Sequence, residues 1–90
     1  MAAGDVNSRR TDSTGNIRLL TGTLEAANGT TVALMGTSSY IIACVVQNAD
    51  DEEGARVQLN SNGSTTVNGS IHVTSAASDV DVWNYICFYV

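Results

Sequence analysis

Short runs of β-branched and apolar residues alternate along this chain with turn-forming Gly, Asn and Ser residues. The runs recur about every 8–12 residues, and no segment has the roughly 3.6-residue periodicity of an amphipathic helix. Val, Ile and Thr favour strands because their branched side chains fit a pleated surface. The pattern therefore predicts an all-β fold, a small antiparallel β-sandwich or barrel of six to seven strands.

The apolar runs give the expected strands. They cover residues 17–24, 30–35, 40–47, 55–60, 70–74 and 80–90, with a further short segment at 64–67. The run over 40–47 is apolar on both faces, which predicts a central strand. Asn-Gly pairs mark turns because both residues tolerate a positive φ, and they occur at Asn28-Gly29, Asn62-Gly63 and Asn68-Gly69. The first pair, between two predicted strands, predicts a hairpin.

The first 16 residues differ from the rest. They read MAAGDVNSRRTDSTGN and contain one bulky apolar residue, Val6. They include no apolar segment of the signal-peptide type, so we expect synthesis in a cytoplasm and read the N-glycosylation patterns at the Asn-Gly pairs as turns. A polar stretch of this kind cannot form a core element alone. We expect an extended N-terminal arm over 1–16 and one β-sandwich domain over 17–90.

Charge excludes several classes of function. The 90-residue chain has 4 Arg, 9 acidic residues and a net charge of −5. Neutralising phosphates requires basic residues, so we expect no nucleic-acid partner. No apolar run approaches the roughly 20 residues of a membrane-spanning helix, so we expect no membrane partner. Charged residues make up 14% of the chain, against about 25% in an average soluble protein, which indicates a surface that lies against other proteins.

The two cysteines lie in the apolar runs IIACVV and YICFYV. Given cytoplasmic synthesis, we expect Cys44 and Cys87 to be buried, reduced thiols. A disulfide would require facing strands that bring their Cα atoms within about 7 Å. With no third Cys and one His, the chain lacks a zinc ligand set, and we expect no metal and no cofactor.

The last predicted strand has two different faces. One face carries the set Val80, Val82, Asn84, Ile86, Phe88 and Val90, which suits an aliphatic core. The other carries an aromatic stripe of Trp83, Tyr85 and Tyr89. Because Tyr and Trp are enriched at protein interfaces, the stripe is a candidate interface or ligand-binding surface. The alternative is that it packs beneath a loop or the N-terminal arm.

Charged side chains gather in two places. Four consecutive carboxylates form an acidic loop of Asp50, Asp51, Glu52 and Glu53. They lack the alternating spacing of an EF-hand, so we interpret the loop as solvated, with a Ca²⁺ site as the alternative. Arg9 and Arg10 are adjacent in the predicted arm, and we take them as candidate interface residues. A contact between these arginines and the acidic loop of another copy is a hypothesis based on charge complementarity.

His72 is the only imidazole and is expected on the polar face of the 70–74 strand. Ser70, Thr74 and Asp81 are candidate partners, but nucleophilic catalysis requires a defined geometry between base and nucleophile. We interpret His72 as a surface residue and expect no catalytic site.

Three features carry a resemblance to a known group of proteins. They are the arm over 1–16, the segment NIRLLTGTLEAANGTTVAL and the aromatic C-terminal strand VWNYICFYV. With these features the chain resembles small virion accessory proteins of tailed bacteriophages, above all capsid decoration (cement) proteins. The resemblance implies a non-enzymatic protein on the outer capsid surface, made in the host cytoplasm, that stabilises the shell. It also implies a homo-oligomer, a homotrimer in particular, bound to the major capsid protein, with the arm lying along the capsid or a neighbouring subunit. The alternative is a receptor- or glycan-binding tip of a tail fibre, with the aromatic stripe facing the host.

Overall fold

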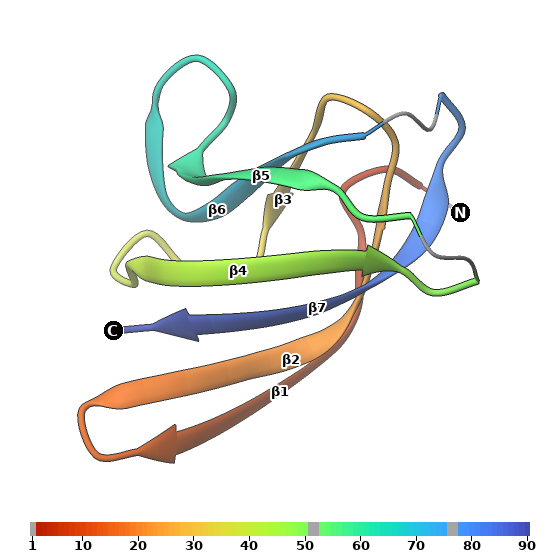
Figure 1. Ribbon diagram of the computed structural model, residues 1–90. Helices are drawn as coiled ribbons and strands as arrows, with labels where there is room; N and C mark the ends of the chain where they lie inside the picture. Colours follow the sequence, from red (N-terminus) through yellow and green to blue (C-terminus); the bar gives the residue numbers. More distant parts are fainter. Residues whose placement is uncertain (1, 51–52, 76–77) are drawn as a thin grey trace.

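Seven strands form two antiparallel sheets in the computed structural model, which describes residues 2–50, 53–75 and 78–90. In chain order they are β1 (Val6–Thr14), β2 (Ile17–Ala26), β3 (Thr30–Ala33), β4 (Ile41–Asn48), β5 (Arg56–Ser61), β6 (Thr66–Thr74) and β7 (Asp81–Tyr89). The larger sheet has the order β1-β2-β7-β4 and the smaller one the order β3-β6-β5 (Figure 1). The prediction of an all-β, antiparallel sandwich-like fold is confirmed.

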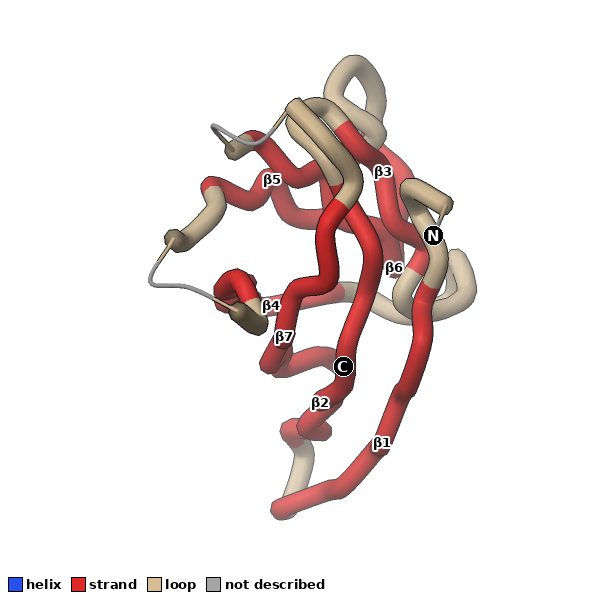
Figure 2. The backbone as a smooth tube through the Cα atoms, turned by 90° about the vertical axis from the view of Figure 1, so that its right-hand side faces the viewer, coloured by secondary structure: helices blue, strands red, loops and turns tan. Residues whose placement is uncertain are grey.

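One apolar core lies between the two sheets. Strand β6 contributes Ile71 and Val73, and β2 contributes Leu20 and Leu24, all fully buried. These residues alternate with more exposed ones, as expected when one face of each strand points inward. Figure 2 shows the β1–β2 hairpin at the end of the larger sheet, away from β5. The core therefore lies beneath β2, β7 and β4, and β1 forms one rim of the molecule.

The extended N-terminal arm is not confirmed, because residues 6–14 form β1. This strand pairs with β2 in an antiparallel register from Ser8↔Thr23 to Thr14↔Ile17. The two strands are joined by Gly15-Asn16, and Gly15 has the positive φ of 65° that short hairpin turns require. A polar segment can form an edge strand because the pairing comes from backbone hydrogen bonds, whatever the side chains.

The expectation of a central strand over 40–47 is wrong, because β4 is an edge strand and β2 and β7 are central. The outer edge of β4 is covered in another way. The buried Asn60 accepts from the Ile41 N–H and donates to the Ile41 carbonyl, both at 2.9 Å, so a side chain replaces a neighbouring strand. Further along, residues 53–55 bond to the β4 backbone, for example through the carbonyl of Val46. The apolar sequence thus reflects a covered edge rather than a central position.

The three Asn-Gly pairs have three different roles. Asn62-Gly63 joins β5 to β6, as predicted, and Gly63 has a φ of 93°. Asn28-Gly29 lies between β2 and β3, which belong to different sheets, so the predicted hairpin there is wrong. Asn68-Gly69 lies inside β6, where the Gly69 carbonyl accepts the N–H of Met35. An Asn-Gly pair therefore indicates where the backbone can adopt a positive φ, but it does not determine which strands pair on either side of it.

The cysteines form a disulfide between Cys44 on β4 and Cys87 on β7, so the expectation of reduced thiols is wrong. The two residues lie directly opposite each other in the β4–β7 register, with Cα atoms 4.1 Å apart. The strand pairing supplies the facing arrangement that a disulfide needs. The bond ties the edge strand β4 to a central strand.

Gly22 is expected to tolerate no larger residue. It lies opposite Tyr85, and a Cβ atom there would overlap the Ser8 carbonyl oxygen and lie 2.9 Å from the Tyr85 hydroxyl. Gly22→Ala should therefore lower the free energy of unfolding in urea by roughly 1–3 kcal/mol, the usual cost of overpacking. Gly36→Ala is the control, because its Cβ would meet no atom within 4 Å. Equal stability of the two variants would contradict this account of Gly22.

The disulfide is expected to add substantially to stability. Its cysteines are 43 residues apart, and the loop-closure model gives about 4 kcal/mol for a loop of this length. Thiol alkylation and intact-mass measurement should find no reactive thiol before reduction and two after it. Reduction, or the double change Cys44→Ala and Cys87→Ala, should lower the midpoint of thermal unfolding. Alkylation of both cysteines in the unreduced native protein would refute the bond.

Candidate functional site

The aromatic face of β7 is buried in the core. Trp83 is fully buried, and Tyr85 and Tyr89 are each 4% exposed. The indole Nε1 of Trp83 donates to the Ala26 carbonyl at 2.9 Å, and the Tyr85 hydroxyl donates to the Ser8 carbonyl at 2.9 Å. Large rings can be buried where their polar atoms find such partners. The predicted aromatic stripe therefore does not form a surface site. Tyr85 packs beneath the N-terminal segment, in agreement with the alternative prediction that the stripe packs beneath a loop or the N-terminal arm.

Arg9 lies on the same inner side of the sheet. Its Nη1 donates to the Leu34 carbonyl at 2.7 Å, which ties β1 to the chain that follows β3. Burial raises the pKa of the Tyr85 hydroxyl above its ordinary value, and the nearby Arg9 guanidinium opposes this by a smaller amount. The hydroxyl thus remains a hydrogen-bond donor at neutral pH. Arg9 therefore helps to hold β1 against the chain that follows β3.

The opposite face of the larger sheet is apolar and exposed. Within the part of the chain that the structure describes, every large apolar side chain that is exposed lies on β2, β4 or β7, or directly beside β4 or β7. We call these residues the outer apolar face: Ile17, Tyr40, Ile42, Val45, Ile86, Phe88 and Val90. The aliphatic set that the sequence assigned to the core thus supplies the surface.

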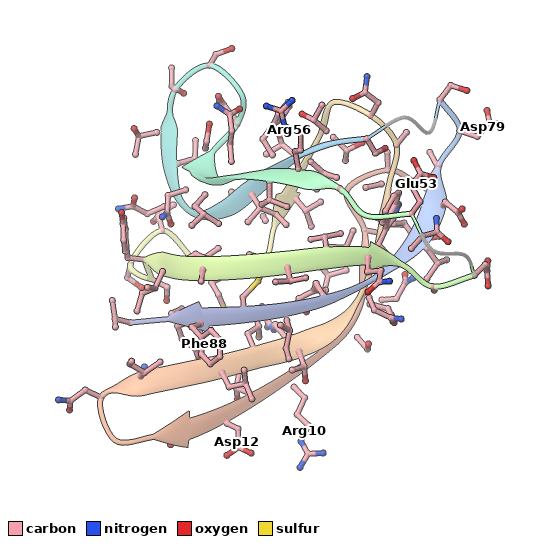
Figure 3. The ribbon with its side chains drawn as sticks, viewed as in Figure 1. Arg10, Asp12, Glu53, Arg56, Asp79 and Phe88 are labelled. Carbon is pink, nitrogen blue, oxygen red and sulfur yellow. A yellow bond between two sulfur atoms is a disulfide. The ribbon has the colours of Figure 1, made fainter. Side chains whose placement is uncertain are left out.

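The strand pairing makes this face contiguous. Ile86 is the cross-strand neighbour of Val45, which is 62% exposed. At the other end, Val90 exchanges two backbone hydrogen bonds with Tyr40, at 2.9 and 3.0 Å. Phe88 lies on the same face of β7, between Ile86 and Val90 (Figure 3). Monomeric soluble proteins rarely expose large contiguous apolar patches, and such patches mark interaction surfaces.

The outer apolar face has a shallow depression and a polar rim. The depression, about 340 Å³ in volume, is lined by the apolar Val45 and Ile86, by the polar Thr21, Gln47 and Asn84, and by Gly22 and Tyr85. Arg10 and Asp12 form the rim on β1, where Arg10 lies opposite Thr21 in the register (Figure 3). Arg10 and Arg9 therefore point to opposite sides of the sheet, as adjacent residues of a strand do. A flat apolar centre with a charged border is typical of protein–protein interfaces.

The acidic loop is only partly within the described residues, since Asp51 and Glu52 lie outside them. Asp50 is exposed, and its N–H donates to the Asn48 side chain at 2.9 Å. The Glu53 carbonyl accepts the Asn48 N–H at 2.8 Å, so backbone contacts shape the loop base. No group of three or more His, Cys, Asp or Glu side chains in the described ranges could hold a metal ion. The contact of the loop with Arg9 and Arg10 of another copy stays a hypothesis.

His72 lies on β6, hydrogen-bonded through Nδ1 to the Thr31 hydroxyl of β3 at 2.9 Å. The same hydroxyl donates to the Asn62 carbonyl at 3.3 Å. Asp81, one of its predicted partners, lies in the other sheet and bonds to Asn48 instead. The structure thus does not bring His72 and Asp81 together, and His72 links two strands of the smaller sheet.

The chain matches no family model, and no curated protein or solved structure is significantly similar to it. None of the residues that the structure describes belongs to a helix long and apolar enough to cross a membrane.

Protonation of Asp81 in acid is expected to lower the stability of the protein, because the Asp81 carboxylate accepts a hydrogen bond from Asn48 at the base of the acidic loop. Hydrogen bonds from the Asn48 side chain and then from the Val82 N–H hold the pKa of its carboxyl below the ordinary value. A lowered pKa contributes stability above the ordinary pKa of Asp, which is lost as pH falls through the folded value. The free energy of unfolding should therefore fall more between about pH 5 and about pH 2 in the wild type than in Asp81→Asn.

Asp79→Asn is the control for this measurement, because it removes an exposed carboxylate near the same strand end. If Asp81→Asn has the same acid profile as the wild type, the assignment to Asp81 is wrong.

Proposed function

We propose that this protein is a non-enzymatic structural subunit that docks its outer apolar face on another protein. In the role of a capsid decoration protein, its partner is the major capsid protein, and the contact reinforces the outer surface of the shell. The observation that carries the proposal is the contiguous apolar face formed by β4, β7 and the start of β2. It favours binding to protein over catalysis.

The size of this face indicates how such a contact works. The three strands that carry the face, about 4.8 Å apart and about 30 Å long, present roughly 400 Å². At about 25 cal/mol per Å², burying an apolar area of this size yields at most about 10 kcal/mol before the costs of association. Those costs are estimated at about 4–15 kcal/mol, so a single contact is of modest affinity. Many copies on a lattice stabilise it collectively, which suits a protein that covers a shell.

The composition supports the same proposal. Charged residues are 14% of the chain, and the centres of interfaces are depleted of charge. The outer apolar face consists of aliphatic and aromatic side chains, and its charged border lies on β1 at Arg10 and Asp12. A face of this kind loses little solvation energy of charged groups when a partner covers it.

The alternative, a glycan-binding tip of a tail fibre, rested on aromatic residues that are buried. Tyr40 and Phe88 are the exposed aromatic side chains among the described residues, and both belong to the outer apolar face. A glycan would therefore compete for the same surface, and one set of variants tests both proposals.

The test is binding to purified, undecorated capsids of the phage that encodes the chain. Wild-type protein should bind saturably at lattice stoichiometry. Phe88→Lys places a charge in the centre of the outer apolar face and should weaken binding tenfold or more, as at other interface centres, where truncation costs about 2 kcal/mol. Gln58→Lys is the control, since it adds the same charge at an exposed position of β5 in the other sheet.

Equal binding of the two variants, with both folded by circular dichroism, would overturn the docking face. Absence of capsid binding together with glycan-array binding that Phe88→Lys abolishes would replace the decoration role with the glycan-binding one.

A further inference from the structure

Among the residues that the structure describes, no strand pairs with the outer edge of β1 in the larger sheet. This strand is nine residues long and ends the order β1-β2-β7-β4 (Figure 2). Its register with β2 is unbroken from Ser8 to Thr14, and its single irregularity lies between Val6 and Ser8. A long, regular edge exposes a row of backbone N–H and C=O groups that can pair with another strand.

The other sheet edges in the described part of the chain are protected. The outer edge of β4 is covered by Asn60 and by residues 53–55. Strand β3 is four residues long, and β5 has a bulge between Leu59 and Ser61. Short strands, bulges, covering segments, Pro and charged side chains, above all Lys, are the usual means of blocking edge pairing. Over residues 8–14 the described structure has no bulge and no covering segment on β1, which contains neither Lys nor Pro and carries charges of both signs, Arg9, Arg10 and Asp12.

The charges on β1 are arranged symmetrically around one residue. Arg10 and Asp12 precede and follow Thr11 in the strand. Their side chains have opposite charges and lie on the outer side of the sheet. The described residues give Arg10 no hydrogen bond or ion pair, and Asp12 uses one carboxylate oxygen to accept the N–H of Ser13. The Arg10 guanidinium and the second carboxylate oxygen of Asp12 are thus available to a partner strand.

We propose that β1 pairs with β1 of a second copy, antiparallel and centred on Thr11. A two-fold axis perpendicular to the sheet must pass between two copies of one residue, because side chains alternate between the faces. With Thr11 at the axis, Arg10 of each copy lies opposite Asp12 of the other, which gives two favourable cross-strand pairs.

The neighbouring symmetric registers are unfavourable. Centring on Arg10 or on Asp12 would place each of these residues opposite its own copy, with like charges in contact. Centring on Arg9 would do the same. The charge pattern therefore selects one register, and β1 joins two larger sheets into a continuous sheet of eight strands. This inference does not rest on the proposed function, because it uses the edge of the sheet and leaves the outer apolar face open.

Charge reversal tests the pairing on the full-length protein. Light scattering over a concentration series should give twice the 9.4 kDa of one chain for the wild type. Arg10→Asp and Asp12→Arg should each raise the dimer dissociation constant roughly tenfold or more, as both cross-strand pairs become like-charged. The double reversal should restore it to within about threefold of the wild type.

Two controls separate pairing from overall charge. Asp12→Arg changes the net charge of each chain from −5 to −3 and so reduces the general repulsion between two copies. If overall charge alone mattered, this variant would therefore form a stronger dimer. Arg56→Asp reverses an exposed charge on β5 and should leave the dissociation constant unchanged. A monomer at every concentration, a trimer, or single reversals without effect on folded protein would overturn the proposal.

A cross-linking experiment fixes the register independently. Thr11→Cys should form an intermolecular disulfide on mild oxidation, since the two copies of residue 11 face each other. Ser13→Cys lies opposite Arg9 in this register and should remain largely uncross-linked. Peptide mapping distinguishes these bonds from the native Cys44–Cys87 bond. Equal cross-linking of the two variants would refute the register centred on Thr11.

Discussion

The hydrogen bonds of two buried aromatic side chains determine which side of the larger sheet faces the core. The Trp83 indole donates to Ala26, and the Tyr85 hydroxyl donates to Ser8, so both rings are buried without an unsatisfied donor. Because side chains alternate along a strand, this burial turns Ile86 and its aliphatic neighbours toward solvent. Strand β7 is central and pairs with β2 and β4, so its orientation sets the character of the whole outer surface. The candidate interaction face is thus a consequence of the burial of Trp83 and Tyr85, whose hydrogen-bond donors find partners in the core.

Local sequence determined most strands but not their partners. The runs within β2, β4 and β7 were predicted to within a few residues because β-branched and aromatic residues are dense there. Whether Asn28-Gly29 closes a hairpin depends on packing between distant segments, which local patterns do not contain. Strand β1 was missed because its side chains are polar and its pairing is a backbone property. The sequence signal for this strand is the Gly15-Asn16 pair, a two-residue hairpin turn that directly precedes a strong strand.

The candidate site was harder to predict, because both faces of the last strand are apolar. Periodicity separated the aromatic set from the aliphatic set, but hydrophobicity alone could not show which one the core accepts. The polar atoms of Trp83 and Tyr85 decide this, and their partners are 57 and 77 residues away in sequence. The Arg9-Arg10 pair was similarly misleading as a unit. Adjacent residues of a strand point to opposite sides, so Arg9 stabilises the interior while Arg10 lies on the outer rim.

The two surfaces that this fold leaves available lie at right angles and do not compete. Edge pairing at β1 extends the sheet within its own plane through backbone hydrogen bonds. The outer apolar face, in contrast, would contact a partner that lies above the plane of the sheet. A two-fold axis perpendicular to the sheet keeps both outer faces on the same side, so pairing doubles the apolar area presented to a third protein. Since about 400 Å² per copy supports only modest affinity, two linked faces would bind far more tightly through their raised effective concentration. Polar side chains on β1 suit this arrangement, because an apolar edge would associate without a defined register.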